Sequence, residues 1–169
     1  MKPRIWMIAS AALAAAMLAG CATPPGQADM TLLQRMDQAM RQAAPTLRVS
    51  LRLTPDQVTT GGVIGAEVAS PVGGYVYLFQ LTTDGRATTL VFPNAMDGAN
   101  FLPAGGVMQL PRPNWRMAAR GPAGVGYLMA VVSEKPLDLM QLQTQTPQGQ
   151  LALSGTYGAA MATLREVAP

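Results

Sequence analysis

The sequence reads YVYLFQL at residues 75–81 and, after a turn that contains Asp84 and Gly85, RATTLVF at residues 86–92. Glycine adopts the positive φ that a tight turn requires, so the two runs predict a β-hairpin. Successive side chains of a strand point to opposite faces, and the first run is apolar on both. It therefore predicts a central strand that is covered on both sides, by a second sheet and by a helix or loop.

Further strands are predicted around this hairpin, because short apolar runs recur about every ten residues between Gly, Pro, Asn or Asp. Residues 47–53 alternate between apolar and polar side chains, as in a strand with one exposed face. The other candidate strands are residues 63–70, 107–110, 125–133 and 151–153. The pattern predicts a mainly β fold, an immunoglobulin-like antiparallel β-sandwich.

An amphipathic helix is predicted at residues 29–44, before the first strand. Apolar side chains recur there at spacings of three and four, and Pro45 ends the pattern. Asp29 or Thr31 can cap its start. Its polar face mixes Gln, Asp and Arg, which favours packing on the domain over a membrane-surface or partner-binding helix.

A second helix is predicted at the C-terminus. Tyr157, Met161, Leu164 and Val167 follow one another at helical spacing. Residues 139–169 are therefore expected to form an extension that ends in a helix packed on the domain. Residues 141–150 are rich in glutamine and carry no clear periodicity.

The N-terminus has the pattern of a secretory signal. Lys2 and Arg4 precede an apolar stretch at residues 5–18 that is shorter than a membrane span. The stretch ends in LAGC at residues 18–21, which resembles the lipobox of bacterial lipoproteins. That resemblance implies cleavage of a signal peptide, residues 1–20, and acylation of Cys21.

The expected location is the outer membrane, with the domain anchored through lipid on Cys21 and facing the periplasm. In enterobacterial lipoproteins an aspartate after the cysteine retains the protein at the inner membrane, and here that residue is Ala22. Residues 21–28 contain two prolines and a glycine and are expected to form a tether. Cys21 is the only cysteine, so no intramolecular disulfide can form.

Charge and composition argue against several function classes. Lys2 and Arg4 account for two of the twelve cations, which leaves ten against nine acidic residues after the signal. This balance gives no basic footprint for nucleic acid. The chain has no histidine, which excludes Ser-His-Asp catalysis and His-based metal sites. Acidic residues are few and scattered, so we read them as solvated turn residues and expect no catalytic residue, metal or cofactor.

A set of short motifs in the middle of the chain is similar to the DUF4384 domain family. It covers residues 45–138 and includes a Gly-Tyr strand, an Asp-Gly turn, a Leu-Val-Phe-Pro-Asn run, an Asn-Phe-Leu-Pro-Ala-Gly loop and a Gly-Pro-Ala-Gly turn. The signature residues, which we read as structural, are Gly74, Tyr75, Asp84, Gly85, Phe92, Pro93, Asn94, Gly105, Gly121, Pro122 and Gly124. The resemblance implies a compact β-sandwich without established catalytic residues, found in lipoproteins and sometimes beside type VI secretion components.

Three functions follow from these observations. The preferred hypothesis is a lipid-anchored, non-catalytic interaction module that docks another envelope protein, as an accessory of a secretion apparatus such as type VI. The alternative is a peptidoglycan or glycan binder, in which the aromatic side chains of Tyr75, Tyr77, Trp115 and Tyr157 form a stacking surface. A hydrolase is the least favoured class, because no catalytic set is visible.

Overall fold

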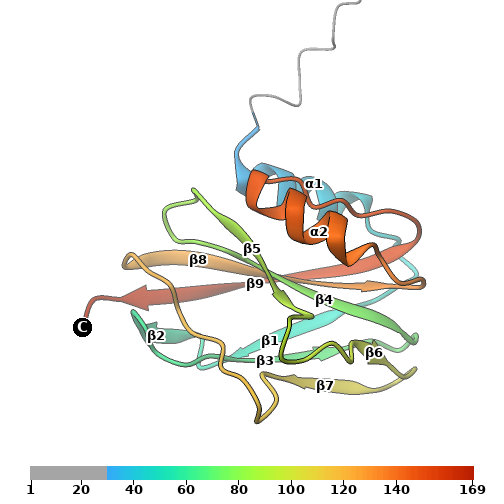
Figure 1. Cartoon of the computed structure of the whole chain (residues 1–169), viewed down its shortest axis with the longest axis horizontal. Helices are drawn as coiled ribbons and strands as arrows, with labels where there is room; N and C mark the ends of the chain where they lie inside the picture. Colours follow the sequence, from blue (N-terminus) through green and yellow to red (C-terminus); the bar gives the residue numbers. More distant parts are fainter. Residues whose placement is uncertain (1–29) are drawn as a thin grey trace, which may run out of the picture.

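Two β-sheets and a pair of short helices form three layers in the computed structural model, which describes residues 30–169 (Figure 1). The expected signal peptide 1–20, the lipidation site Cys21 and the tether 21–28 lie outside the described residues. The two helices cover one face of the larger sheet, and the smaller sheet covers the other face (Figure 1).

The smaller sheet, sheet A, has three antiparallel strands in the order β1-β3-β7. They are β1 (Ser50–Thr54), β3 (Gly65–Ala69) and β7 (Val107–Leu110). The larger sheet, sheet B, has the order β2-β9-β8-β4-β5, and a short strand β6 also pairs with β4. Its strands are β2 (Gln57–Thr59), β4 (Gly74–Leu81), β5 (Thr88–Phe92), β6 (Phe101–Leu102), β8 (Gly124–Ser133) and β9 (Tyr157–Val167). The β2–β9 pair is parallel and the other pairs are antiparallel.

Strand β4 lies inside sheet B and is buried on both faces, as predicted. Val76 and Leu78 point into the core between the two sheets. Tyr77 and Phe79 point into a second core, which lies between sheet B and the helices. The predicted cover of this strand, by a second sheet and by helices, is confirmed.

The predicted hairpin is confirmed as β4 and β5, with Leu81 opposite Thr88. Gly85 has φ +67° in the connecting turn. The backbone N–H of Arg86 donates to Asp84 Oδ1 at 3.0 Å, and the Thr82 hydroxyl donates to the same atom at 2.6 Å. These hydrogen bonds lower the pKa of Asp84, with the largest contribution from Thr82, and they hold the turn.

The predicted N-terminal helix is α1 (Leu32–Gln42), and it packs on sheet B. Thr31 is its N-cap: the Gln34 N–H donates to the Thr31 hydroxyl, and the Gln34 side chain accepts from the Thr31 N–H. The helix buries Met36 and Ala39 in the core beneath it. Packing on the domain, the favoured interpretation of this helix, is therefore confirmed.

The C-terminal helix predicted from Tyr157 to Val167 is wrong, because this segment is the long strand β9. Its side chains alternate between two cores: Tyr157 and Met161 face the helices, whereas Leu164 faces sheet A. The apparent helical spacing thus joined residues that point to opposite faces of a sheet. The strand forms because ten of its residues pair with residues of β8. This tertiary interaction outweighs the helical spacing of the local sequence.

The short C-terminal helix lies earlier, in the glutamine-rich stretch. It is α2 (Leu139–Gln145), capped by the Asp138 side chain and continued by the 3-10 turn η1 (Thr146–Gln148). The expected strand at 151–153 is absent, and the sandwich extends beyond the boundary at 138 to Val167. The fold class is confirmed: mainly β, with an N-terminal helix and a short C-terminal helix. Within residues 30–169 no helix is long and apolar enough to cross a membrane.

We predict that a chain ending at Gly155 does not fold cooperatively, because loss of β9 leaves a buried edge of β8 unpaired and opens both cores. Urea unfolding followed by circular dichroism tests this. A chain ending at Val167, which lacks two exposed residues, is the matched control and should unfold like the full chain. A cooperative, native-like transition in the shorter chain would contradict the prediction.

Candidate functional site

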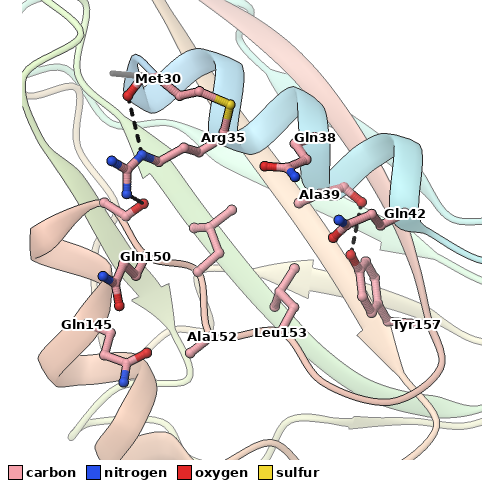
Figure 2. Close-up of a pocket in the computed structure, with 12 residues that line it drawn as sticks. Met30, Arg35, Gln38, Ala39, Gln42, Gln145, Gln150, Ala152, Leu153 and Tyr157 are labelled. Carbon is pink, nitrogen blue, oxygen red and sulfur yellow. Dashed lines mark hydrogen bonds between the residues drawn. The ribbon is translucent and has the colours of Figure 1, made fainter. Parts of the chain in front are cut away.

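A cleft lies between α1 and the segment that follows α2 (Figure 2). Its volume is about 560 Å³, within the range of ligand sites in proteins. The residues that line it are Met30, Arg35, Gln38, Ala39, Gln42, Gln145, Gly149, Gln150, Leu151, Ala152, Leu153 and Tyr157. We call it the amide cleft.

Four glutamines give the amide cleft its character. Gln38 and Gln42 lie one turn apart on α1, and Gln145 and Gln150 come from the opposite wall (Figure 2). A carboxamide offers both donors and an acceptor. The two walls can therefore hydrogen-bond to a ligand that presents donors and acceptors of its own.

The floor of the amide cleft is apolar. Ala152 and Leu153 lie between the two walls (Figure 2), and Leu151 is buried in the core under the helices. The Tyr157 hydroxyl donates to the Ala39 carbonyl oxygen at 3.0 Å. Only 5% of Tyr157 is exposed, and burial raises the pKa of its phenol above the ordinary value.

Backbone contacts hold the two walls together. The Arg35 guanidinium donates to the carbonyl oxygens of Met30 and Gly149, each at 3.3 Å, and so joins α1 to the opposite wall. Gly149 has φ +77°, and a Cβ at this position would lie 2.1 Å from Leu32 Cδ2. The positive φ favours glycine where the loop meets α1, and a larger residue would also displace the Leu32 side chain. Ala152 has φ +43°, a conformation that non-glycine residues seldom adopt outside functional or over-determined sites.

Among residues 30–169, the lining has one charged side chain, Arg35, and no carboxylate. Within residues 30–169 no cluster of three or more His, Cys, Asp or Glu side chains is placed to hold a metal ion. The chemistry present in the amide cleft is therefore hydrogen bonding and apolar contact, which suits a neutral, polar ligand.

The predicted aromatic surface is wrong. Tyr77, Trp115 and Tyr157 are 1%, 7% and 5% exposed, and they are divided between the two cores. The Tyr77 hydroxyl accepts from the Leu137 N–H at 2.7 Å, so it has a structural partner. Tyr75 is half-buried with its ring 5.3 Å from that of Phe101. The stacking surface was predicted from residue type, which does not reveal whether an aromatic ring is exposed.

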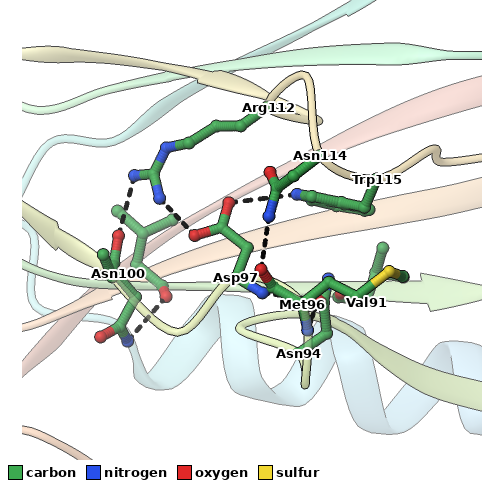
Figure 3. A network of polar contacts seen from close by, with 10 residues as sticks. Val91, Asn94, Met96, Asp97, Asn100, Arg112, Asn114 and Trp115 are labelled. Carbon is green, nitrogen blue, oxygen red and sulfur yellow. Dashed lines mark hydrogen bonds and ion pairs between the residues drawn. The ribbon is translucent and has the colours of Figure 1, made fainter.

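Trp115 belongs to a polar and aromatic network at the end of β5 (Figure 3). Its indole N–H donates to Asp97 Oδ2 at 3.1 Å, and Arg112 forms an ion pair with the same carboxylate. The Phe92 and Trp115 rings are parallel with centroids 6.2 Å apart, and the Arg112 guanidinium lies 5.6 Å from the Phe92 centroid. Asp97, which we had read as a solvated turn residue, is buried and organises this junction.

The other signature residues also have structural partners. The Asn94 side chain accepts from the Met96 N–H at 2.9 Å and holds the turn that follows β5. The Asn100 side chain donates to the Val76 carbonyl oxygen at 3.1 Å. The Gly121 N–H donates to the buried Glu166 carboxylate at 2.5 Å, so β9 holds the Gly-Pro-Ala-Gly turn.

Sequence reasoning did not single out the four glutamines of the amide cleft. The polar face of the predicted helix contained Gln38 and Gln42 four residues apart, a spacing that places them on one side of a helix. The opposite wall gave weaker signals: Asp138 as an N-cap, and Gly149 after the glutamine-rich stretch. Only the tertiary structure brings the two walls together.

We predict that Asp97→Ala lowers the free energy of unfolding by about 2 kcal/mol, because it leaves the buried Trp115 N–H without an acceptor. Asp37→Ala, which breaks an exposed ion pair with Arg41 on α1, is the control and should change stability by less than about 0.5 kcal/mol. Urea denaturation of both variants measures the two effects. Equal effects would contradict a structural role for the network.

We predict that Tyr157→Phe destabilises the protein by about 1 kcal/mol at neutral pH, because the Ala39 carbonyl loses its hydrogen bond. The raised native pKa of Tyr157 means that its stabilisation is present below the ordinary tyrosine pKa of 10.0 and is lost as the pH rises through the native value. The stability difference between wild type and variant should therefore shrink above pH 10. Denaturation curves from pH 7 to 11 test this, and a constant difference would contradict it.

Comparisons with known proteins agree with the signature and add little on function. Residues 57–136 match the family described as "Domain of unknown function (DUF4384)". No curated protein matches the chain. Among solved structures, the chain is similar to Spo0M, a sporulation control protein from Bacillus subtilis, with 10% identity and a TM-score of 0.44 over 75% of this chain and 51% of that chain. The chain thus spans about half the length of that protein. Residues 57–136, which hold the signature motifs, belong to the DUF4384 family, a domain of unknown function.

Proposed function

We propose that this chain is a lipid-anchored, non-catalytic interaction module of the bacterial envelope, and that it binds a partner protein through the amide cleft. The observation that carries the proposal is the cleft itself: a preformed groove of about 560 Å³ whose walls are neutral carboxamides. Its lining combines an apolar floor with a few convergent polar groups, as ligand sites do.

The position of the cleft supports an anchored role. Met30 lines the cleft and lies nine residues after Cys21. A fully extended chain spans at most about 3.3–3.6 Å per residue, so a lipid on Cys21 would keep this wall within roughly 30 Å of the membrane. Two acyl chains already give stable anchoring. The proposed partner is therefore a membrane-proximal protein of the periplasm, with the outer membrane as the site of attachment.

A protein partner is preferred over a glycan because three of the four aromatic rings proposed for stacking are buried and the fourth, that of Tyr75, is half-buried. The one ring in the amide cleft, that of Tyr157, is 5% exposed and its hydroxyl is bonded to Ala39. The family resemblance makes components of a secretion apparatus, such as type VI, the first partners to examine.

Photo-crosslinking in the native host tests the proposal. A photoreactive amino acid at Gln42 or Gln150, on opposite walls, should give one dominant adduct with an envelope protein. The matched control is Thr54, an exposed position on sheet A, which should not give that adduct. Cys21→Ser should release the protein from membranes and weaken the adduct, and mass spectrometry should find an acylated Cys21 peptide in the wild type.

Two results would count against the proposal. If neither cleft position gives an adduct that is absent at Thr54, the amide cleft is not the docking site. If the Cys21 peptide carries no lipid, the chain is not a lipoprotein.

A further inference from the structure

We infer that the occupant of the amide cleft is an extended, uncharged peptide segment that is bound through its backbone by the glutamines of the two walls. The inference rests on the proposed function and names the chemistry of the partner's binding segment. It follows from the spacing, the charge and the rigidity of the cleft.

The spacing of the glutamines fits an extended chain. Gln38 and Gln42 are four residues apart on α1, which corresponds to a rise of about 6.0 Å along the helix. Alternate residues of an extended peptide repeat every 6.6 Å or so. The two carboxamides can therefore meet backbone groups of alternate peptide residues on the same edge. Each backbone unit presents one donor and one acceptor, and a carboxamide can satisfy both.

The opposite wall repeats this chemistry. Gln145 and Gln150 line the cleft on the side of α2, opposite Gln38 and Gln42 (Figure 2). A peptide between the walls has one backbone edge toward each pair of glutamines, while alternate side chains point to the floor. Ala152 and Leu153 provide an apolar surface there, which suits small or aliphatic side chains.

Charge selects against other segments. The part of the lining that the structure describes has no carboxylate to pair with Lys or Arg. Its one cation, Arg35, donates to the Met30 and Gly149 carbonyl oxygens and so serves to hold the walls. A basic peptide side chain on the floor would lose hydration without gaining a matching charge, and an acidic one would compete with the carbonyl oxygens that Arg35 already contacts. Uncharged segments are therefore favoured.

The cleft is also preorganised. The Arg35 contacts, the close approach at Gly149 and the Tyr157–Ala39 hydrogen bond fix both walls before any ligand binds. The conformational cost of binding then falls mainly on the peptide.

Peptide selection on the full mature chain tests the inference. The probe is a random library of nine-residue peptides with acetylated and amidated ends. Selected peptides should lack Asp, Glu, Lys and Arg, and methylation of alternate backbone nitrogens of the best peptide should weaken its binding at least tenfold, measured by calorimetry. Loss of backbone donors has this effect only if the backbone itself is recognised.

Matched variants locate the site. Gln42→Glu replaces a donor with a charged acceptor and should weaken the best peptide about tenfold, and Gln38→Glu should act similarly. Gln143→Glu, at an exposed position of α2 outside the cleft, makes the same chemical change and should leave affinity within twofold. Circular dichroism and thermal melting check that each variant is folded.

Three outcomes would overturn the inference: no peptide selected, charged peptides selected, or no effect of backbone methylation. Binding of N-acetylglucosamine oligomers that is lost in Gln42→Glu would assign the cleft to a glycan. If the crosslinking experiment gives an envelope adduct but no peptide binds, the proposed function stands, and only the inference that the occupant is an extended peptide is overturned. Absence of that adduct would instead remove the proposed function.

Discussion

Strand β4 is apolar on both faces, and the arrangement of the other elements follows from the need to cover both. Its Val76 face is covered by sheet A, and its Tyr77 face by α1 and α2. Burying large apolar side chains on both sides is the main stabilising contribution in such a layered fold. The amide cleft forms where this helical layer remains open, between α1 and the loop after α2 (Figure 2). The groove is thus a product of how the second core is closed.

The family signature accounts for the fold and leaves the ligand open. Phe92, Asn94 and Gly121 sit at junctions where a strand ends or a turn is held by another element. The lining of the amide cleft comes from residues 30–42 and 145–157, which flank the family match at 57–136. The lining of the site therefore lies outside the matched residues, in and just before α1, in α2 with the loop that follows it, and at the start of β9. The DUF4384 match covers β2 to β8, whereas the proposed binding site is built from the elements that flank it.

Much of the fold could be predicted from the sequence, and little of the site. The hairpin, the buried central strand and the capped helix α1 each depend on local pattern or on one turn, so they were predictable. Strand β9 was missed because alanines occupy positions on both of its faces, so its sequence shows no clear alternation of apolar and polar residues. Its pairing with β8 is set by tertiary contact. The aromatic residues failed as a site because residue type does not reveal burial. The glutamines of the cleft come to line one site only after α2 has folded back over sheet B.

The position of β9 has a consequence for the order in which the protein can assemble. The last strand of the chain lies inside sheet B, between β8 and β2, and contributes Leu164 to one core and Tyr157 to the other. A chain that emerges from its N-terminus cannot complete the sheet until nearly every residue has been delivered. Contacts between distant parts of the sequence also make folding slow. The sandwich therefore cannot close before residues 157–167 are available to pair with β8 on one side and β2 on the other.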